Sequence, residues 1–275
     1  MPDLSALPPL REVIRLHNLR ADKALGQNFL LDQNLTDKIA RLAEIKDGAT
    51  VIEIGPGPGG LTRSLVGSPA KAVIAIEYDD RAVTALQDLQ AAAAGKLTLL
   101  KGDALATNLL DLAPAPRAIV ANLPYNISTV LLANWLSQIR ADVNSYSSMT
   151  LMFQKEVADR IVAGSGNKIY GRLSVLTQWL CKVKRVLELP PEAFTPPPKI
   201  NSTVLHFTPR DLPADAPSFA AIEKILHTAF QQRRKMIRSS LKSYAAAIEA
   251  TGIDPTLRAE DLTVENYLQL ASVSK

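Results

Sequence analysis

The stretch NLPYNIST at residues 122–129 combines residue types that suit a planar base carrying an exocyclic amine. Asn122 offers a side-chain oxygen, and the rigid Pro124 holds the carbonyl of Leu123 as a second acceptor. Two such acceptors would bind the two amine hydrogens and favour the charge that develops when the nitrogen attacks a methyl group. The Tyr125 ring would stack on the base. A tight turn without chemistry is the alternative interpretation.

This chemistry needs no strong general base, because the amine proton becomes acidic as the nitrogen attacks and can leave late. The chain has no obvious catalytic histidine or cysteine: its three histidines are scattered and Cys181 is its single cysteine. One cysteine forms neither an internal disulfide nor, by itself, a zinc site. We therefore expect no metal.

The segment VIEIGPGPGGLT at residues 51–62 has the pattern of a strand that runs into a glycine-rich turn and then a helix. Gly55, Gly57 and Gly60 fit the spacing of the dinucleotide fingerprint, in which glycine lets the backbone approach a ligand closely. Nicotinamide enzymes and methyltransferases share this motif, and a plain strand-to-helix turn is the structural alternative.

Two carboxylates follow at the ends of later strands. Glu77, 22 residues after Gly55, would accept hydrogens from both ribose hydroxyls, and Asp103 would accept from an adenine amino group. Each alone is more often a loop or N-cap carboxylate. Their combination at the carboxyl ends of successive strands indicates a nucleoside site.

Phe194 offers a second aromatic ring, in a loop stiffened by three prolines at residues 196–198. It would close on the other face of a base that has been flipped out of its stack. Ordinary packing in the core is the alternative for this side chain.

A parallel sheet must position these residues, and the sequence predicts one. Apolar runs alternate with helical patterns at about 60–67, 80–94 and 128–140, which is typical of crossover connections. Two further strand-like runs would form a hairpin that closes the sheet. Residues 208–217 are expected to be a linker, followed by a helical region with breaks at Gly252 and Pro255. The predicted strands are 50–54, 72–77, 97–101, 118–122 and 148–153, with the hairpin at 182–190 and 202–207.

The composition supports a large domain and a small one, since 275 residues with 47% hydrophobic content can bury a substantial core. No run approaches the roughly 18 apolar residues of a membrane span, and the first twenty residues are charged rather than apolar. We therefore expect a cytoplasmic protein that spans no membrane. We also expect it to be a monomer.

The net charge of +4 is unevenly distributed. Residues 140–210 hold ten Lys or Arg against five acidic residues, and residues 229–242 form a predicted basic helix without any acidic residue. Such clusters indicate a polyanionic partner, although a solvated helix face is the alternative. The cations of the predicted basic helix are Arg233, Arg234, Lys235, Arg238 and Lys242.

Together these motifs resemble the ribosomal RNA adenine N6,N6-dimethyltransferase family, in particular its bacterial small-subunit (16S) branch. The resemblance runs from about residue 20 to 271. It rests on GQNFLLDQN (26–34), EIGPGPGGLT (53–62), AIEYDDR (75–81), GDAL (102–105), NLPYNIST (122–129), FQKEVADRIVA (153–163), YGRLSVLTQ (170–178), FTPPPKINSTVLHF (194–207), AFQQRRKMIRSSL (229–241) and DPTLRAEDLTVENYLQLA (254–271). The lead-in at 21–25, ADKAL, departs from the basic or aromatic residues usual in the family.

The resemblance implies an α/β protein: a Rossmann-like S-adenosylmethionine-dependent methyltransferase sheet over residues 1–210 and a small C-terminal α-helical domain over 211–275 that contacts RNA. It implies that the protein forms N6,N6-dimethyladenosine at two adjacent adenosines near the 3′ end of 16S ribosomal RNA. It also implies a role in small-subunit biogenesis, with the small ribosomal subunit or its precursor as partner. Cofactor contacts carry over to Asn28, Leu30, Gly55, Gly57, Glu77, Asp103 and Asn122, and base contacts to Asn122, Leu123, Tyr125 and Phe194. We expect RNA contacts at Arg233, Arg234, Lys235 and Arg238.

Three other functions are weighed against this one. A nicotinamide oxidoreductase would share the glycine turn but gives no reason for NLPY or the PPPK loop. A large-subunit methyltransferase of the macrolide-resistance type shares GQNF and NLPY-like motifs, whereas FTPPPKI and AFQQRRKMIRSSL favour the small-subunit branch. Intact Glu77, Asp103 and Asn122 argue against a non-catalytic assembly factor.

Overall fold

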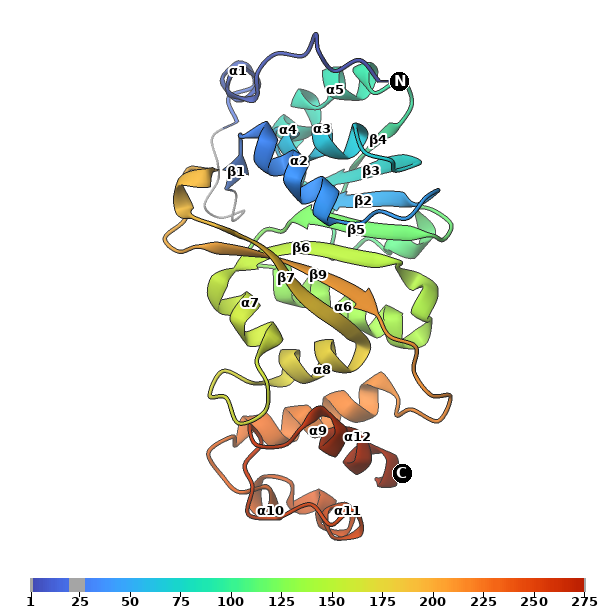
Figure 1. Ribbon diagram of the computed structural model, residues 1–275, viewed down its shortest axis with the longest axis vertical. Helices are drawn as coiled ribbons and strands as arrows, with labels where there is room; N and C mark the ends of the chain where they lie inside the picture. Colours follow the sequence, from blue (N-terminus) through green and yellow to red (C-terminus); the bar gives the residue numbers. More distant parts are fainter. Residues whose placement is uncertain (1, 20–27, 275) are drawn as a thin grey trace. The chain divides into compact units, whose positions relative to one another are not determined.

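Seven strands form the central sheet of the computed structural model, which describes residues 2–19 and 28–274 (Figure 1). The strand order is β4-β3-β2-β5-β6-β9-β7, with parallel pairing from β4 to β6 and antiparallel pairing of β9 to β6. The predicted strands are confirmed, as is the hairpin-like pairing of the last two. Their bounds are β2 (Thr50–Ile54), β3 (Ala72–Glu77), β4 (Leu97–Lys101), β5 (Arg117–Asn122), β6 (Ser148–Gln154), β7 (Cys181–Leu189) and β9 (Ser202–Pro209).

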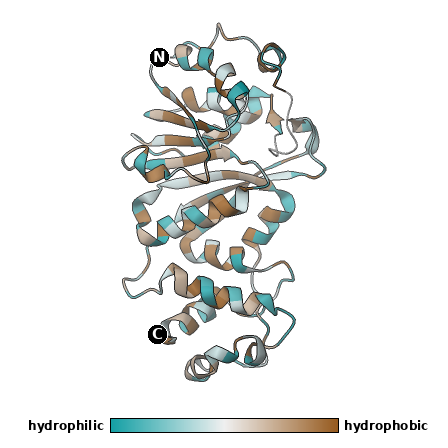
Figure 2. Cartoon of the chain, turned by 180° about the vertical axis from the view of Figure 1, so that it is seen from behind, coloured by the Kyte–Doolittle hydropathy of each residue, from teal (hydrophilic) through white to brown (hydrophobic). Residues whose placement is uncertain are grey.

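The inner parallel strands are almost continuously apolar because helices cover both faces of a parallel sheet and remove them from water. Every residue of β2 is buried, and so are five of the six residues of β3. Figure 2 shows hydrophobic residues along these strands. A parallel register, with Ile54 opposite Ile76, brings the carboxyl ends of β2 and β3 to the same edge of the sheet. Strand β2 lies between β3 and β5, so the connections diverge there, which is where α/β sheets bind ligands.

Short helices pack beside β3 and β4 in the same part of the chain. Asp32 and Asp79 each cap a helix of this region by accepting a backbone N–H, which satisfies a donor that the first turn leaves free. The single helix predicted at 80–94 is two helices that meet at Leu86, whose N–H is shared between two carbonyl oxygens. The helices are α1 (Leu10–Leu16), α2 (Gln33–Leu42), α3 (Gly60–Val66), α4 (Asp80–Ala85) and α5 (Gln87–Ala92), with a 3-10 turn at Leu109–Asp111.

A second, two-stranded sheet joins segments that are far apart in the sequence. Strand β1 (Phe29–Leu30) pairs antiparallel with β8 (Phe194–Thr195), and Leu30 lies opposite Phe194. A 3-10 turn at Pro191–Ala193 precedes β8. No pattern of residues predicted this pairing, because two-residue strands are too short to show a period.

The chain divides into two compact units. The first contains residues up to 132, 144–155 and 184–208; the second contains 133–143, 156–183 and the residues from 209 onward. The domain boundary expected at residue 210 stays a prediction, since a unit of spatial contact need not follow a single boundary in the sequence.

The second unit is helical and is organised around aromatic side chains. Phe230 lies between Tyr170 and Tyr267, with ring centroids 6.3 Å and 6.0 Å away. The Tyr267 hydroxyl donates to the carbonyl of Ala259. Its elements are most of α6 (Ser128–Ala141) and α7 (Lys155–Val162), then α8 (Arg172–Leu180), α9 (Phe219–Gln231), α10 (Ile237–Ser240), α11 (Ala245–Thr251), α12 (Val264–Val273) and a 3-10 turn at Lys242–Tyr244; another such turn, Val143–Ser145, links the two units.

The continuous basic helix predicted across 229–242 is wrong. Helix α9 ends at Gln231 and α10 begins only at Ile237. Between them Met236 is extended and bridges to Arg258, and the N–H of Ile237 donates to the carbonyl of Leu257. These contacts with the segment before α12 replace the helical hydrogen bonds.

Over the described ranges, no helix combines the length and the apolar character that crossing a membrane requires. In the same ranges, His, Cys, Asp and Glu side chains do not gather in groups of three that could hold a metal ion.

The close approach of α3 and β1 can be tested with Gly60→Ala, because a Cβ atom there would lie 2.5 Å from the carbonyl oxygen of Leu30. The backbone must shift to accept it, and we expect the free energy of unfolding in urea to fall by about 1–3 kcal/mol. Gly164→Ala is the control, since that position faces open space and should change stability by less than about 0.5 kcal/mol. Equal stability of the two variants would contradict the close approach.

Candidate active site

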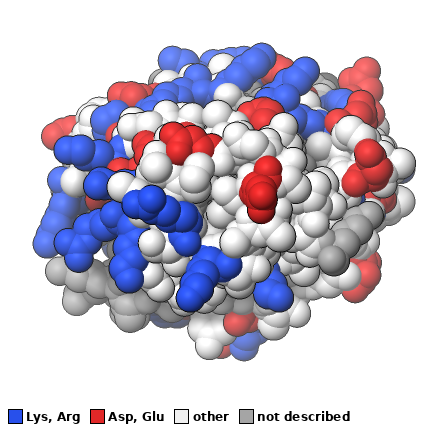
Figure 3. All heavy atoms as spheres, turned by 90° about the horizontal axis from the view of Figure 1, so that it is seen from below, with Lys and Arg blue, Asp and Glu red and all other residues white. Residues whose placement is uncertain are grey.

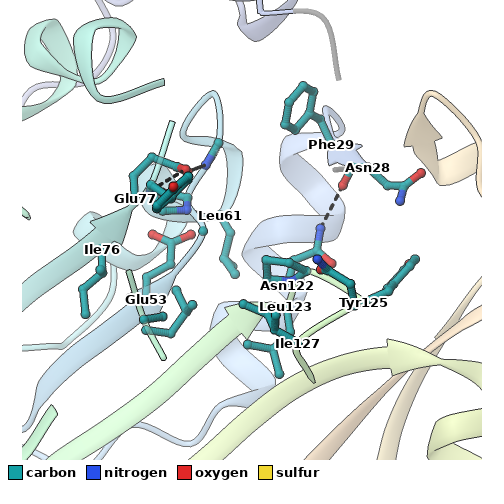
Figure 4. A pocket seen from close by; sticks show the side chains of 18 of the residues that line it. Asn28, Phe29, Glu53, Leu61, Ile76, Glu77, Asn122, Leu123, Tyr125 and Ile127 are labelled. Atoms are coloured by element: carbon teal, nitrogen blue, oxygen red, sulfur yellow. Dashed lines mark hydrogen bonds between the residues drawn. The ribbon is translucent and has the colours of Figure 1, made fainter. Parts of the chain in front are cut away.

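A cavity of about 260 Å³ opens at the carboxyl ends of β2, β3 and β5 (Figure 4). It brings together nearly all the residues predicted for the nucleoside and base sites. The lining includes Asn28, Leu30, Gly55, Gly57, Gly60, Glu77, Asp103, Asn122, Leu123 and Tyr125. Apart from Asn28 and Leu30, which lie at β1, these residues share a location because parallel strands end at a common edge.

Glu77, the last residue of β3, holds the glycine turn in place. Its Oε2 accepts the N–H of Gly57 at 3.0 Å, and its Oε1 accepts those of Tyr78 and Asp79 at 2.8 Å and 2.9 Å. Gly55 and Gly57 have φ values of +66° and +55°, which favour glycine. Burial raises the pKa of the Glu77 carboxyl, and the three backbone donors oppose that shift. The carboxylate therefore ties the turn to the end of β3.

Glu53 is a second acidic side chain in the pocket, and our sequence analysis did not single it out. It lies within β2, is 1% exposed, and its Oε2 has no hydrogen-bond partner among the described residues. Burial raises the pKa of its carboxyl to about 8, and the charge of Glu77 adds to the shift. The nearby Thr62 hydroxyl opposes the shift, although the two groups do not meet in a hydrogen bond of normal geometry. An acidic residue within an otherwise apolar strand, VIEI, was the available signal.

Asp103 lines the pocket but is exposed, and its Oδ1 accepts the N–H of Leu105 at 2.9 Å. Two large side chains on the same wall also went unnoticed in the sequence: Tyr78 is 65% exposed and Leu105 is 40% exposed. Flat apolar surface beside a carboxylate suits a heteroaromatic base with an amino group. Their positions directly after Glu77 and shortly after Asp103 were the available signal.

Asn122, the last residue of β5, has a fixed amide orientation. Its Nδ2 donates to the carbonyl of Asn28 at 3.0 Å, as the dashed line in Figure 4 marks. Because a carbonyl only accepts, the amide must turn its NH2 group toward Asn28. The Asn122 Oδ1 is then left on the other side of the amide as an acceptor.

The two predicted aromatic base contacts occupy different environments. Tyr125 lines the pocket, and its hydroxyl lies 2.7 Å from the Ser202 hydroxyl. Phe194 is 3% exposed and belongs to the hydrophobic cluster that includes Leu30 and Val204, and it is not part of the pocket lining. Phe194 is thus packed in the core, as the alternative interpretation of the sequence expected. Its contact with a base stays a prediction.

The predicted RNA-binding cations lie in the second unit: Arg233, Arg234 and Lys235 lie between α9 and α10, and Arg238 lies in α10. Arg233 pairs with Glu260, with Nε 3.0 Å from Oε2, and also donates to the Lys168 carbonyl. Arg234, Lys235 and Arg238 are exposed. Figure 3 shows Lys and Arg side chains gathered on one side of the face seen from below. The atypical lead-in at residues 21–25 lies outside the described residues.

Comparisons with known proteins agree with this geometry. A family model described as ribosomal RNA adenine dimethylase matches residues 18–275. A Cereibacter sphaeroides protein named ribosomal RNA small subunit methyltransferase A is 54% identical over 98% of both chains. A protein of the same name from Rhodospirillum rubrum is 51% identical over 96% of this chain and 92% of that relative.

Two solved structures share the fold over most of the chain. A dimethyladenosine transferase from Plasmodium falciparum superposes with a TM-score of 0.73 at 26% identity, covering 87% of this chain and 94% of that one. The 23S rRNA methyltransferase ErmE gives a TM-score of 0.68 at 25% identity, covering 89% and 98%.

The Rossmann-like sheet, with its glycine turn and acidic strand ends beside an Asn-Leu-Pro-Tyr loop, defines a methyltransferase of the S-adenosylmethionine-dependent class. Within that class, the chain belongs to the ribosomal RNA adenine dimethylase family.

The buried carboxyl of Glu53 predicts a pH dependence of stability. Its pKa rises from 4.5 to about 8 on folding, so its favourable contribution is complete below pH 4.5 and is lost as the pH rises through about 8. Between pH 4.5 and about 8 the free energy of unfolding of the parent should therefore decline with pH. Glu53→Gln has no carboxyl to titrate there, so its decline should be smaller by up to about 1.4 kcal/mol per pH unit. Urea unfolding at pH 5 to 8 measures it.

The control is Glu249→Gln, at an exposed glutamate of α11, which should keep the parental slope. If the Glu53→Gln curve runs parallel to that of the parent across pH 5 to 8, the buried carboxyl is ionised throughout and this interpretation fails.

Proposed function

We propose that the protein transfers methyl groups from S-adenosylmethionine to the N6 amine of adenosines in small-subunit (16S) ribosomal RNA and so produces N6,N6-dimethyladenosine. The orientation of the Asn122 amide by the Asn28 carbonyl carries the chemical part of this proposal. Relatives named as small-subunit methyltransferases are 51–54% identical, whereas the 23S enzyme is 25% identical, which supports the small-subunit substrate.

The pocket residues fit the methyl donor. S-adenosylmethionine supplies an electrophilic methyl group on a positively charged sulfur. The Glu53 Oε2 is buried and has no hydrogen-bond partner in the part of the chain that the structure describes. It would face the cationic part of the donor, and a nearby cation would favour ionisation of this carboxyl. The Glu77 Oε2 accepts one N–H and retains a lone pair for a ribose hydroxyl. The residues we assign to the donor are Asn28, Leu30, Glu53, Gly55, Gly57, Glu77, Asp103 and Asn122.

Asn122 and Leu123 would activate the target amine. The lone pair of an aromatic amine is delocalised into the ring and attacks poorly, so acceptors fixed around the amine hydrogens lower the barrier as positive charge develops on nitrogen. The Asn122 Oδ1 is held in place by the donation of its NH2 group to Asn28. The Leu123 carbonyl is the second acceptor, followed by the rigid Pro124. After the first transfer one N–H remains, and one acceptor suffices for it.

Tyr125 would stack on the extruded adenine and compensate part of the free energy lost when the base leaves its own stack. Phe194 would reach the other face of the base only after its loop moves, since the ring is buried in the core. Arg234, Lys235 and Arg238 would contact phosphates of the RNA. Because the proposed substrate is a ribosomal subunit, we propose that the protein acts in the cytoplasm. We also propose that it acts as a monomer.

The direct test incubates the protein with labelled S-adenosylmethionine and small ribosomal subunits that lack the modification, and then maps dimethyladenosine in the RNA. Label in dimethyladenosine of the small-subunit RNA supports the proposal. Label confined to 23S RNA in a parallel incubation with large subunits would instead assign the large-subunit function.

Asn122→Ala should separate chemistry from binding. Loss of one preorganised acceptor typically lowers the rate of the chemical step about 10²–10³-fold. Affinity for the subunits should hold, because phosphate contacts dominate RNA binding. Single-turnover methylation at saturating donor and subunits measures the step, after the affinity for S-adenosylmethionine has been measured on the same variant.

Tyr125→Ala is the matched comparison, since stacking acts in the ground and transition states alike and should mainly raise KM for the subunits. If Asn122→Ala reacts within a few-fold of the parent under saturating conditions, the proposed activation of the amine is wrong.

The exposed cations after α9 and in α10 predict a salt-dependent contribution to binding. Replacing Arg234, Lys235 and Arg238 with Gln should flatten the slope of log affinity against log salt by about two to three units, because each phosphate contact releases counterions. Binding to small subunits at several salt concentrations measures the slope. Replacing the exposed Lys38, Lys46 and Lys71 of the first unit is the charge-matched control and should leave more of the slope intact. Identical slopes for both triple variants would exclude a specific phosphate contact here.

A further inference from the structure

The Tyr125 ring is attached to the central sheet by a hydrogen bond. Its hydroxyl lies 2.7 Å from the Oγ of Ser202, a residue 77 positions later in the chain. Tyr125 belongs to the loop after β5, whereas Ser202 is the first residue of β9. The bond therefore joins a pocket loop to a strand that is not a neighbour of β5 and contributes no residue to the pocket lining.

Ser202 is a rigid anchor. Its side chain is fully buried, and its backbone pairs with Gln154 in the ladder between β6 and β9. The preceding residue, Asn201, accepts the N–H of Lys155 through its carbonyl. A hydroxyl fixed in this way defines where the far end of the Tyr125 side chain must lie.

The orientation of the Tyr125 ring matters because a base stacks on it only when the two rings lie in parallel planes. A tyrosine side chain turns about two bonds, and fixing its hydroxyl at one end and its backbone at the other restricts both. A ring ordered before the base arrives loses less conformational entropy on binding. The Tyr125 hydroxyl is the polar handle that allows this, and phenylalanine would lack it.

We infer that Ser202 is a positioning residue for the RNA base: its hydroxyl holds the Tyr125 ring in the plane on which the target adenine stacks. This inference rests on the stacking role of Tyr125 in the proposed function. Ser202 itself does not line the pocket, so it would act on the base only through Tyr125.

The next residue provides an internal comparison. Thr203 is also fully buried, but within the described chain its hydroxyl has no hydrogen-bond partner. A substitution that removes the Thr203 hydroxyl perturbs the same strand at the same depth and leaves the Tyr125 contact intact. Thr203→Val is therefore a matched control for Ser202→Ala.

The test measures KM for unmodified small subunits and the single-turnover rate for four variants: Ser202→Ala, Tyr125→Phe, their combination, and Thr203→Val. We expect Ser202→Ala to raise KM about two- to tenfold, the range that one neutral hydrogen bond supports, with a single-turnover rate within twofold of the parent. Tyr125→Phe removes the same bond from the other side and should give a similar KM. The double variant should be no worse than either single variant, because both remove one interaction.

One further variant, Ser202→Thr, completes the experiment beside the Thr203→Val control. Ser202→Thr keeps a hydroxyl and should restore KM toward the parental value, and Thr203→Val should leave KM unchanged. If Ser202→Ala does not fold, Tyr125→Phe still tests the bond. Parental KM for Tyr125→Phe, or additive effects in the double variant, would overturn the inference.

Tyr125→Ala distinguishes this inference from the proposed function. If Tyr125→Ala raises KM and both Ser202→Ala and Tyr125→Phe do not, stacking stands and the positioning role of Ser202 is wrong. If Tyr125→Ala leaves KM unchanged, the stacking role fails, and the role of Ser202 fails with it.

Discussion

The candidate site depends on one constraint: parallel strands buried on both faces present polar groups to a ligand mainly at or next to their ends. Strands β2, β3 and β5 are apolar along nearly their whole length, so Glu77 and Asn122 are polar because they are the last residues of their strands. The shared register places these ends at one edge, beside the glycine turn. The polar groups of the pocket thus lie where they do because the rest of each strand is buried on both faces of the sheet.

Within that edge, hydrogen bonds to the backbone fix the orientation of the functional side chains. Glu77 is held by three N–H groups and Asn122 by one carbonyl, so neither relies on a neighbouring side chain for its geometry. Backbone groups cannot rotate away, which gives preorganisation of the kind that electrostatic catalysis requires. Glu53 is different, because its buried Oε2 has no partner within the described residues and a cation that entered the pocket would favour its ionisation.

The sequence predicts the parts of this site that depend on local pattern. Strand ends, glycine spacing and the NLPY loop identify Glu77, Asp103, Asn122 and Tyr125, since each lies at a break in hydrophobic periodicity. Contacts between distant segments leave no such pattern: neither the β1–β8 pairing nor the Tyr125–Ser202 bond is visible in one sequence. The interruption after Gln231 was missed for the same reason, because the contacts of Met236 and Ile237 with residues near 258 replace helical bonds that the local sequence favours.

The pairing of β1 with β8 has a consequence for how the chain acquires its activity. Leu30 and Asn28 form a wall of the pocket, and Asn28 also orients Asn122, yet the strand beside them comes from residues 194–195. Closing a loop of that length is among the slower events of folding, because chain entropy is lost before the contact rewards it. During synthesis the glycine turn and β5 emerge well before β8 does. The β1–β8 support of the pocket wall therefore forms only after residues 194–195 have been made, late in synthesis.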